Sequence, residues 1–228
     1  KEGLKHPQKS IFELNYEILK SLGRGEHGEV FKVVDRRDRQ IYAVKQLKGN
    51  ADQFRAEIVK ISRISNLVSS TNIIKYNYTF FENNTWNIIM EYCKMNLREK
   101  FNLWKRKKVK IEKINLLRLI KHVAKGLHKL HKNGISHLDL KPENILIAKI
   151  RGKEKYKIGD MGHAQFTEFF SSGTRFNRTK NPSAFINNSV ISNEKLFLNL
   201  VIEETHEDGE LNLLKENKSQ ELDTGGFL

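Results

Sequence analysis

Several features of secreted and membrane proteins are missing from this sequence. Its 228 residues include a single cysteine, Cys93, so no disulfide can form within the chain, and a reducing, intracellular setting is expected. No apolar run approaches the length that spans a bilayer, and Lys1–Leu14 has no signal-peptide pattern. With only three prolines, the chain has no Pro-rich linker, and it shows no internal repeat. These absences favour an intracellular globular protein.

The composition supplies enough apolar residues for a core. A hydrophobic fraction of 38% with 30% charged residues is typical of folded rather than disordered proteins. A chain of this length can form one large domain or two small ones.

The net charge of +14 is distributed unevenly. Residues 181–228 contain nine acidic and three basic residues, a net of −6, so residues 1–180 carry +20. The densest basic stretch is 104–110, Trp-Lys-Arg-Lys-Lys-Val-Lys. Such a stretch can attract nucleic acid, an acidic partner or a nuclear import receptor. It is also typical of a solvated lysine-rich loop, the interpretation that we favour.

Short runs of β-branched and aromatic residues in the first half predict five strands, over Tyr16–Leu22, Glu29–Val34, Ile41–Gln46, Ile73–Phe81 and Trp86–Glu91. Residues 82–85 predict a hairpin turn. A helix is expected over Asp52–Asn66, with Asp52 as its N-cap. Its predicted inner face contains Phe54, Ile58, Ile61 and Ser65. The first half therefore predicts a five-stranded antiparallel sheet with one helix.

The second half changes to a helical period. Its apolar positions step by three and four, which predicts an amphipathic helix, with a stop at Asn133-Gly134. Short strands are expected at Ile145–Ile147 and Tyr156–Ile158, around Arg151-Gly152. The positions that predict the helix are Leu116, Ile120, Val123, Leu127 and Leu130.

A glycine-rich segment lies between two predicted strands, at 23–30, Gly-Arg-Gly-Glu-His-Gly-Glu-Val. Glycines let a backbone close over phosphate oxygens, although an ordinary hairpin turn has a similar sequence. Lys45 follows in an apolar strand, where an ammonium is costly without a partner. Glu57 on the next helix is a candidate partner, and the pair could then reach the α- and β-phosphates. An edge lysine and a solvated glutamate remain the alternative.

The strongest signal is the run 137–144, His-Leu-Asp-Leu-Lys-Pro-Glu-Asn. Asp139 can accept a hydroxyl proton, and Lys141 can neutralise a migrating phosphoryl group. Asn144, together with Asp160 of the segment Asp160-Met161-Gly162, offers oxygen ligands to Mg²⁺, a hard cation. A chance match to this combination is very improbable.

With these motifs in order, the sequence resembles the eukaryotic protein kinase family from about Tyr16 to Phe176. The resemblance implies an α+β, bilobal fold, with ATP and Mg²⁺ in the cleft and a protein hydroxyl as acceptor. It assigns catalytic roles to Lys45, Glu57, Asp139 and Lys141, and part of a regulatory spine to Ile61, His137 and Met161. Around ATP it places Leu22, Gly23, Gly25, Gly28, Val30, Ala43, Lys45, Met90, Glu91, Cys93 and Leu146.

Two departures narrow the resemblance. Leu138 stands where most kinases have the Arg that binds a phosphorylated activation loop, so switching by that phosphate is not expected. The run 157–164, Lys-Ile-Gly-Asp-Met-Gly-His-Ala, together with Glu91-Tyr92-Cys93, is similar to the Wee-type cell-cycle kinases, although Met90 differs from their usual gatekeeper. That similarity implies a cyclin-dependent kinase as substrate and a nuclear location, with the cytoplasm as alternative. Both Ser/Thr and Tyr acceptors stay open.

Beyond Phe176 we find no A-P-E-like anchor and no Asp in an apolar helix. The expected domains are an extension at 1–15, an N-lobe with hinge at 16–93, a partial C-lobe at 94–176 and an acidic tail at 177–228. Whether that tail is genuine or arises from the gene model or splicing stays open. An active kinase is our first hypothesis. A nucleotide-binding pseudokinase or scaffold is the second, and a nucleic-acid-binding module is the third.

Overall fold

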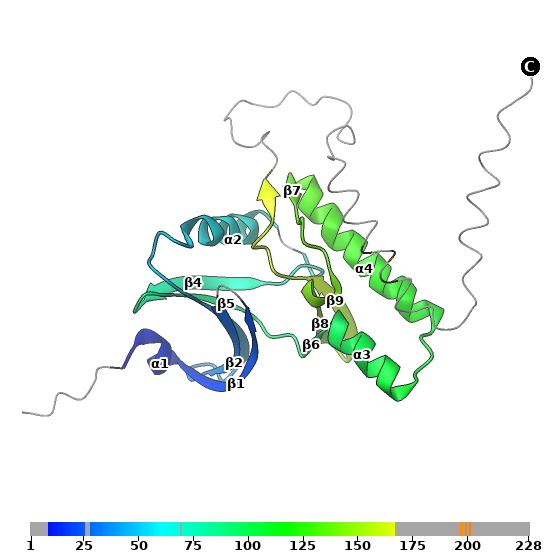
Figure 1. Cartoon of the computed structure of the whole chain (residues 1–228), viewed down its shortest axis with the longest axis horizontal. Helices are drawn as coiled ribbons and strands as arrows, with labels where there is room; N and C mark the ends of the chain where they lie inside the picture. Colours follow the sequence, from blue (N-terminus) through cyan, green and yellow to red (C-terminus); the bar gives the residue numbers. More distant parts are fainter. Residues whose placement is uncertain are drawn as a thin grey trace, which may run out of the picture.

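The five strands of the first half form one antiparallel sheet, in the order β1-β2-β3-β5-β4 (Figure 1). The structure, a computed structural model, describes residues 9–25, 28–68 and 70–166 and positions 197, 199 and 201. The predicted α+β fold with this sheet is confirmed. The strands are β1 (Tyr16–Gly25), β2 (Gly28–Asp35), β3 (Ile41–Lys48), β4 (Tyr76–Glu82) and β5 (Thr85–Glu91).

The turn between β4 and β5 follows from its sequence. Asn83 and Asn84 both have positive φ, at 47° and 53°, which asparagine tolerates better than most residues. The predicted hairpin turn at 82–85 is confirmed. The strand predicted from Ile73 begins later, because Ile73 makes only an isolated bridge to Ile158 of the other lobe.

A short N-terminal helix, α1 (Ile11–Asn15), was not predicted. Ser10 caps it in a capping box with Glu13, and the Glu82 carboxylate accepts hydrogen bonds from the N–H groups of Ile11 and Phe12, both at 2.7 Å. Phe12 is buried in the same cluster as Val33, Val44 and Ile89. Residues just before the first strand therefore pack on the sheet.

The helix α2 (Arg55–Leu67) crosses the other face of the sheet. Leu47 and Ile88 of the sheet pack there against Ile58 and Ile61. The predicted N-cap was wrong: the helix begins after Phe54, with no side-chain cap. Ser65 is exposed, and Ile64 takes the predicted inner position because it lies one turn after Ile61.

The second lobe contains two long helices and a hairpin, with α4 (Lys113–Lys132) as the predicted amphipathic helix. Its C-cap at Asn133 agrees with the predicted stop. The helix α3 (Leu97–Lys107) was missed, and the basic stretch expected as a loop is helical up to Lys107. The strands of this lobe are β6 (Met95–Asn96), β7 (Ile135–Ser136), β8 (Ile145–Ile150), β9 (Lys153–Ile158) and β10 (Gln165–Phe166), and η1 (Pro142–Asn144) is a 3-10 turn.

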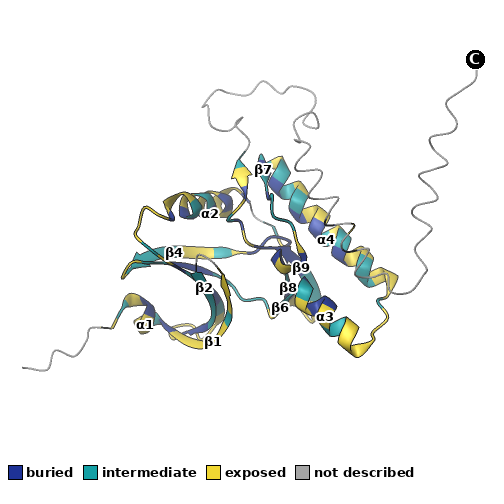
Figure 2. Cartoon of the chain, viewed as in Figure 1, coloured by how far each residue is buried: buried dark blue, intermediate teal, exposed yellow. Residues whose placement is uncertain are grey.

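The core of the second lobe lies between α4 and the β8–β9 hairpin. Figure 2 shows buried residues there and exposed residues at the end of α3. At Gly126 of α4 a Cβ would come within 2.7 Å of the Asn72 carbonyl oxygen and 2.8 Å of Ile158 Cδ1. The absence of a side chain at this position therefore lets α4 approach β9.

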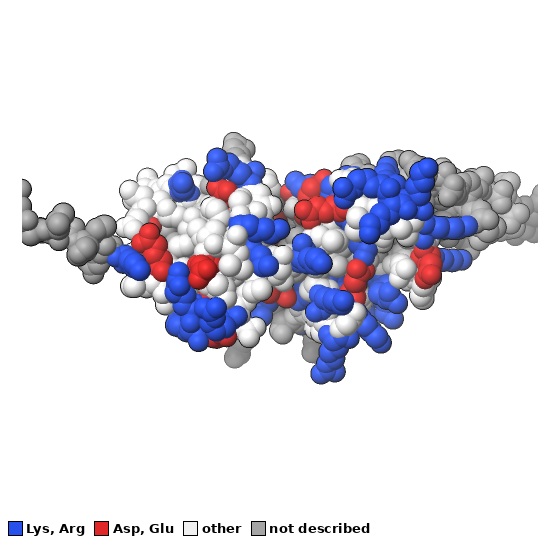
Figure 3. Space-filling model, turned by 90° about the horizontal axis from the view of Figure 1, so that it is seen from below, with Lys and Arg blue, Asp and Glu red and all other residues white. Residues whose placement is uncertain are grey.

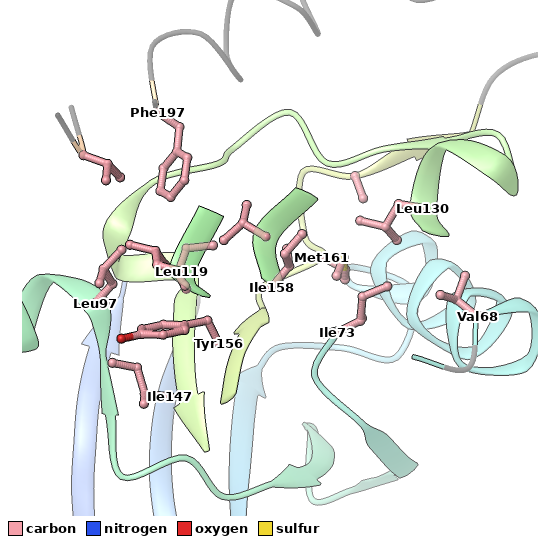
Figure 4. Packing of buried hydrophobic residues seen from close by; sticks show 14 of the residues in the cluster. Val68, Ile73, Leu97, Leu119, Leu130, Ile147, Tyr156, Ile158, Met161 and Phe197 are labelled. Atoms are coloured by element: carbon pink, nitrogen blue, oxygen red, sulfur yellow. The ribbon is translucent and has the colours of Figure 1, made fainter. Parts of the chain in front are cut away.

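Two residues from far along the chain belong to this core. Phe197 is 3% exposed and Val201 is fully buried, in one cluster with Leu97, Phe101 and Leu119. Figure 4 shows the Phe197 ring pointing into the cluster on the side of Leu97 and Leu119. The sequence predicted only a weakly patterned tail at these positions, and the structure adds that Phe197 and Val201 help to close the core of the second lobe.

Within the described ranges, none of the helices is both long and apolar enough to traverse a lipid bilayer.

Candidate active site

A cleft of about 310 Å³ lies between the lobes. Residues from both lobes line it, and most of the predicted catalytic, nucleotide-binding and metal-binding residues are among them. Those that line it are Leu22, Gly23, Val30, Ala43, Lys45, Glu57, Met90, Glu91, Cys93, Asn144, Leu146 and Asp160. Gly25, Gly28, Asp139 and Lys141 lie outside the lining. The sequence had not indicated Tyr76 or Lys94, which also line it.

The glycine-rich segment forms the end of the β1–β2 hairpin, where Gly25 pairs with Gly28. A Cβ on Gly28 would lie 2.0 Å from the carbonyl oxygen of Gln46, whereas a Cβ on Gly23 would meet nothing within 4 Å. Gly28 is therefore required by the close approach of β2 to β3. Gly23, which lines the cleft, has the open space that a ligand could occupy.

Lys45 of β3 sits between two carboxylates. Its Nζ lies 2.9 Å from Glu57 Oε1 of α2 and 3.6 Å from Asp160 Oδ1. Burial alone would lower the pKa of Lys45, but Asp160 and Glu57 together raise it above its ordinary value. Burial is the largest influence on Asp160 and opposes its charge, but Lys45, the Gly162 N–H and two nearby histidines together outweigh burial, so the pKa of Asp160 is lowered. The predicted Lys45–Glu57 pair exists, and the two pKa shifts favour the charged forms of Lys45 and Asp160 at neutral pH.

The loop before η1 holds a second polar cluster. Asn144 Nδ2 donates to the Asp139 carbonyl at 2.8 Å and to Asp139 Oδ2 at 2.9 Å. Lys141 Nζ lies 2.8 Å from Asp139 Oδ2, and this bond raises the pKa of Lys141. Since both bonds of Asn144 use its nitrogen, its amide oxygen stays available for a ligand on the cleft side.

Two residues of this region have a left-handed backbone. Leu138 has φ of 63° and Asp160 has φ of 49°. For a leucine this conformation costs about 1 kcal/mol. Such strain at a site is maintained only when the surrounding structure holds the backbone in place.

Buried groups connect the catalytic loop to both lobes. His137 Nε2 lies 2.8 Å from the Gly159 carbonyl, and burial lowers the pKa of His137, so the ring is neutral and donates there. The Met161 N–H donates to the Tyr76 hydroxyl at 3.3 Å. Ile61 and Met161, two of the predicted spine residues, are buried, in different clusters. Tyr76 packs against both clusters and so joins the lobes.

The Glu91 side chain binds the other lobe, a role that sequence reasoning missed. Its Oε1 accepts from Lys157 Nζ at 2.6 Å and from the Lys75 N–H at 2.7 Å. The backbone of Glu91 also donates to the Lys75 carbonyl. A lysine beside the Asp160 motif was visible in the sequence, but its partner lies 66 residues away. Next to it, burial raises the pKa of the Cys93 thiol to about 12.

The helix α2 makes two further contacts with the segment after Asp160. Lys60 Nζ donates to the Gly162 carbonyl at 2.7 Å. The Arg63 guanidinium lies 4.3 Å from the centre of the Phe166 ring, within cation–π range. Together with the Lys45–Glu57 pair, these contacts hold α2 against the cleft.

Comparison with known proteins agrees with this geometry. The family model described as "Protein kinase domain" matches residues 16–196, so the match extends beyond Phe176. A Wee1-like protein kinase from Arabidopsis thaliana is 31% identical over 158 residues, which cover 68% of this chain and 30% of the relative.

Other relatives are similar to a comparable degree. The membrane-associated tyrosine- and threonine-specific cdc2-inhibitory kinase of Drosophila melanogaster is 33% identical, over 67% of this chain and 28% of the relative. Homeodomain-interacting protein kinase 1 of Mus musculus is 34% identical, over 66% of this chain and 13% of the relative. The chain thus spans less than a third of the length of these relatives.

Proposed function

Because the chain belongs to the protein kinase family, we propose that it binds ATP with Mg²⁺ and transfers the γ-phosphate to a hydroxyl group of a protein. The observation that carries the proposal is the joint assembly of both polar clusters. Lys45 holds Glu57 and faces Asp160, while Asp139 is held by Asn144 and Lys141. Phosphoryl transfer in protein kinases uses groups of both kinds, a lysine–glutamate pair with a metal-binding aspartate and a catalytic-loop aspartate with its asparagine.

The donor atoms fit a magnesium ion. Asn144 and Asp160 line the same cleft, and the amide oxygen of Asn144 is left over by its two hydrogen bonds. Asp160 is ionised, since Lys45 lowers its pKa. Mg²⁺ prefers oxygen ligands and keeps several waters, so two protein ligands suffice. When bound, the ion would neutralise charge on the phosphates.

Each of four residues of the chain then has its own role in the phosphate transfer. Lys45 holds the α- and β-phosphates, and Glu57 holds Lys45. Asp139 accepts the proton of the acceptor hydroxyl as the new oxygen–phosphorus bond forms. Lys141 offsets charge on the phosphoryl group as its bond to the oxygen of the β-phosphate breaks. ADP leaves with that bonding electron pair.

We further propose that the arrangement does not depend on a phosphate in the activation segment. Leu138 offers no cation to bind such a group. Lys60 and Arg63 of α2 instead contact Gly162 and Phe166 directly. The active arrangement is thereby supported by side chains that are always present. Phosphatase treatment should leave the transfer rate unchanged, and a large loss would refute this part.

The Wee-type motifs and the two cell-cycle relatives support a narrower proposal. We place the chain with kinases that inhibit cyclin-dependent kinases, with the nucleus or the cytoplasm as its location. The name of the Drosophila relative includes both tyrosine and threonine as acceptors. A cyclin-dependent kinase tested as substrate, with phosphotyrosine and phosphothreonine measured separately, would decide between the acceptors.

The central experiment measures phosphate transfer from ATP to protein substrates. Asp139→Asn is the control, because it keeps the shape of the side chain and loses the base, with an expected fall of about 100- to 10,000-fold. ATP with Mg²⁺ should also raise the melting temperature. Stabilisation without transfer above the control would instead favour a nucleotide-binding pseudokinase or scaffold. That alternative is prompted by the missing A-P-E-like anchor in 177–228.

A further inference from the structure

A second hollow adjoins the nucleotide cleft, along the exposed side of α3. We call it the α3 groove, and its volume is about 760 Å³. Three of its lining residues, Lys94, Met95 and Glu99, also line the nucleotide cleft. Among the residues that the structure describes, the lining is Lys94, Met95, Glu99, Asn102, Leu103, Lys105 and Arg106. An extended ligand in the groove would therefore end beside the bound nucleotide.

The groove is basic, because Lys94, Lys105 and Arg106 line it together with one described carboxylate, Glu99, and two neighbouring carboxylates pair with other cations. Glu99 accepts from the Asn96 N–H at 2.9 Å as part of the helix cap. Glu143 pairs with Arg98 at 2.9 Å, and Glu154 binds Lys100.

Within the described ranges, no carboxylate pairs with Lys94 or Arg106. Figure 3 shows Lys and Arg side chains gathered over the part of the surface where α3 lies in Figure 1. Lys107 and Lys108 continue the positive surface past the groove. A ligand with negative charge fits this surface by charge complementarity.

The lining favours a peptide over a nucleic acid. Single-stranded nucleic acids bind basic grooves that offer aromatic rings for stacking. Trp104, the aromatic residue of α3 nearest in sequence, packs on Phe101 with ring centres 5.8 Å apart and has Lys100 over its ring at 5.0 Å. None of the described residues that line the groove is aromatic, but Met95 and Leu103 offer an apolar floor.

We propose that the α3 groove binds an acidic peptide segment that carries an apolar side chain. The carboxylates meet Lys94, Lys105 and Arg106, and the apolar side chain rests on Met95 and Leu103. That the segment belongs to the protein substrate, next to its acceptor hydroxyl, rests on the proposed function. The groove itself does not require phosphate transfer.

The test measures binding of a short fluorescein-labelled peptide of glutamates with one central leucine, by anisotropy, to the full chain without ATP. Affinity should fall as salt rises. The double variant Lys105→Glu/Arg106→Glu should weaken binding at least about tenfold, through like-charge repulsion. The matched control Lys48→Glu/Lys132→Glu changes the net charge equally at exposed sites away from the groove, and its affinity should change little. Leu103→Asn should weaken binding several-fold.

Three outcomes would overturn the proposal. Equal losses in the double variant and its matched control would show attraction by net charge alone. Tighter binding of a single-stranded RNA oligonucleotide with the same dependence on Lys105 and Arg106 would assign the groove to nucleic acid. Peptide binding only after the acidic residues of 203–223 are changed to their amides would make this chain's own segment the occupant.

The readouts separate this inference from the proposed function. The melting shift with ATP and Mg²⁺ should be the same in the double variant as in the unchanged chain, which shows that the fold and nucleotide cleft are intact. Peptide binding without phosphate transfer would sustain the groove and refute only the kinase activity. Phosphate transfer without peptide binding would sustain the kinase activity and refute the groove as a peptide site.

Discussion

The two lobes close their cores in different ways. In the N-terminal lobe, the buried residues of both clusters lie between Phe12 and Ile89, on strands that are mostly joined by short turns. The cluster of the second lobe runs from Ile64 on α2 to Val201. The two clusters of the first lobe are therefore built from one continuous part of the chain. The second lobe depends on side chains that are distant in sequence, whose contacts form at a higher cost in chain entropy.

The largest effect is expected from removing Phe197, one of the distant side chains on which the core of the second lobe depends. Phe197→Ala removes a ring that is 3% exposed from the core of the second lobe, so we expect a loss of about 3–5 kcal/mol in unfolding free energy. Chemical denaturation measures the loss. Asn199→Ala is the control, because Asn199 lies between Phe197 and Val201 and is exposed. If both variants unfold at the same denaturant concentration, Phe197 does not close the lobe.

A smaller effect is expected where α4 approaches β9. Gly126→Ala places a methyl group within 2.8 Å of Asn72 and Ile158, so we expect a destabilisation of about 1–3 kcal/mol. Thermal unfolding provides the measurement. Ala124→Ser, at an exposed position of the same helix, should cost only about 0.5 kcal/mol through helix propensity. A Gly126→Ala chain as stable as the unchanged one would contradict the close packing.

The contact between α2 and Gly162 connects the two lobes, and its loss should be felt in both. Lys60→Ala removes a charge-assisted hydrogen bond of 2.7 Å, with an expected cost of about 1.5 kcal/mol. Amide hydrogen exchange should become faster in Arg55–Leu67 and near Gly162. The control is Arg55→Ala, which breaks only a surface pair with Asp52. Faster exchange confined to the N-terminal lobe would show that the Lys60–Gly162 contact does not couple the stability of the two lobes.

The smallest expected effect is on the pH dependence of stability, and it depends on a difference in histidine content between the two lobes. Among residues 9–25, 28–68 and 70–93 there is no histidine, whereas α4 carries His122. Burial, helped by nearby lysines and Arg118, lowers the pKa of His122 from 6.5 to about 4. The unfolded chain therefore binds a proton between these values and the folded chain does not, so stability falls as pH falls from 6.5 to 4.

Because the His122 ring is only partly buried, water screens this effect to about 1 kcal/mol or less. The His122 Nδ1 accepts the Tyr156 N–H at 3.3 Å, a bond that protonation removes. Denaturation midpoints measured across this pH range should therefore vary less in His122→Gln. Equal pH dependence in both chains would show that His122 does not contribute.

Which contacts could be predicted from the sequence depends on how far apart the interacting residues lie along the chain. Asp139, Lys141 and Asn144 lie within one short run, so their place in a common site could be inferred directly, whereas the contacts among them came from the structure. Lys45 and Glu57 stand on neighbouring elements, and that pairing was inferred from strand and helix patterns.

The contacts that sequence reasoning missed join distant residues. Glu82 accepts hydrogen bonds from the first turn of α1, and Lys157 binds Glu91. Periodicity describes which face of an element is buried, but it does not identify the partner. The helix α3 was missed because its lysines and arginines masked the apolar spacing of Leu97, Phe101 and Trp104.

The position of Tyr76 has a consequence for how the molecule melts. Its ring packs in the cores of both lobes, and its hydroxyl binds the Met161 N–H. Two regions that share a partly buried side chain lose its contacts together, so we expect their unfolding to be cooperative. We expect one calorimetric transition rather than two. A nucleotide bound mainly by the first lobe would then protect the second lobe from unfolding as well.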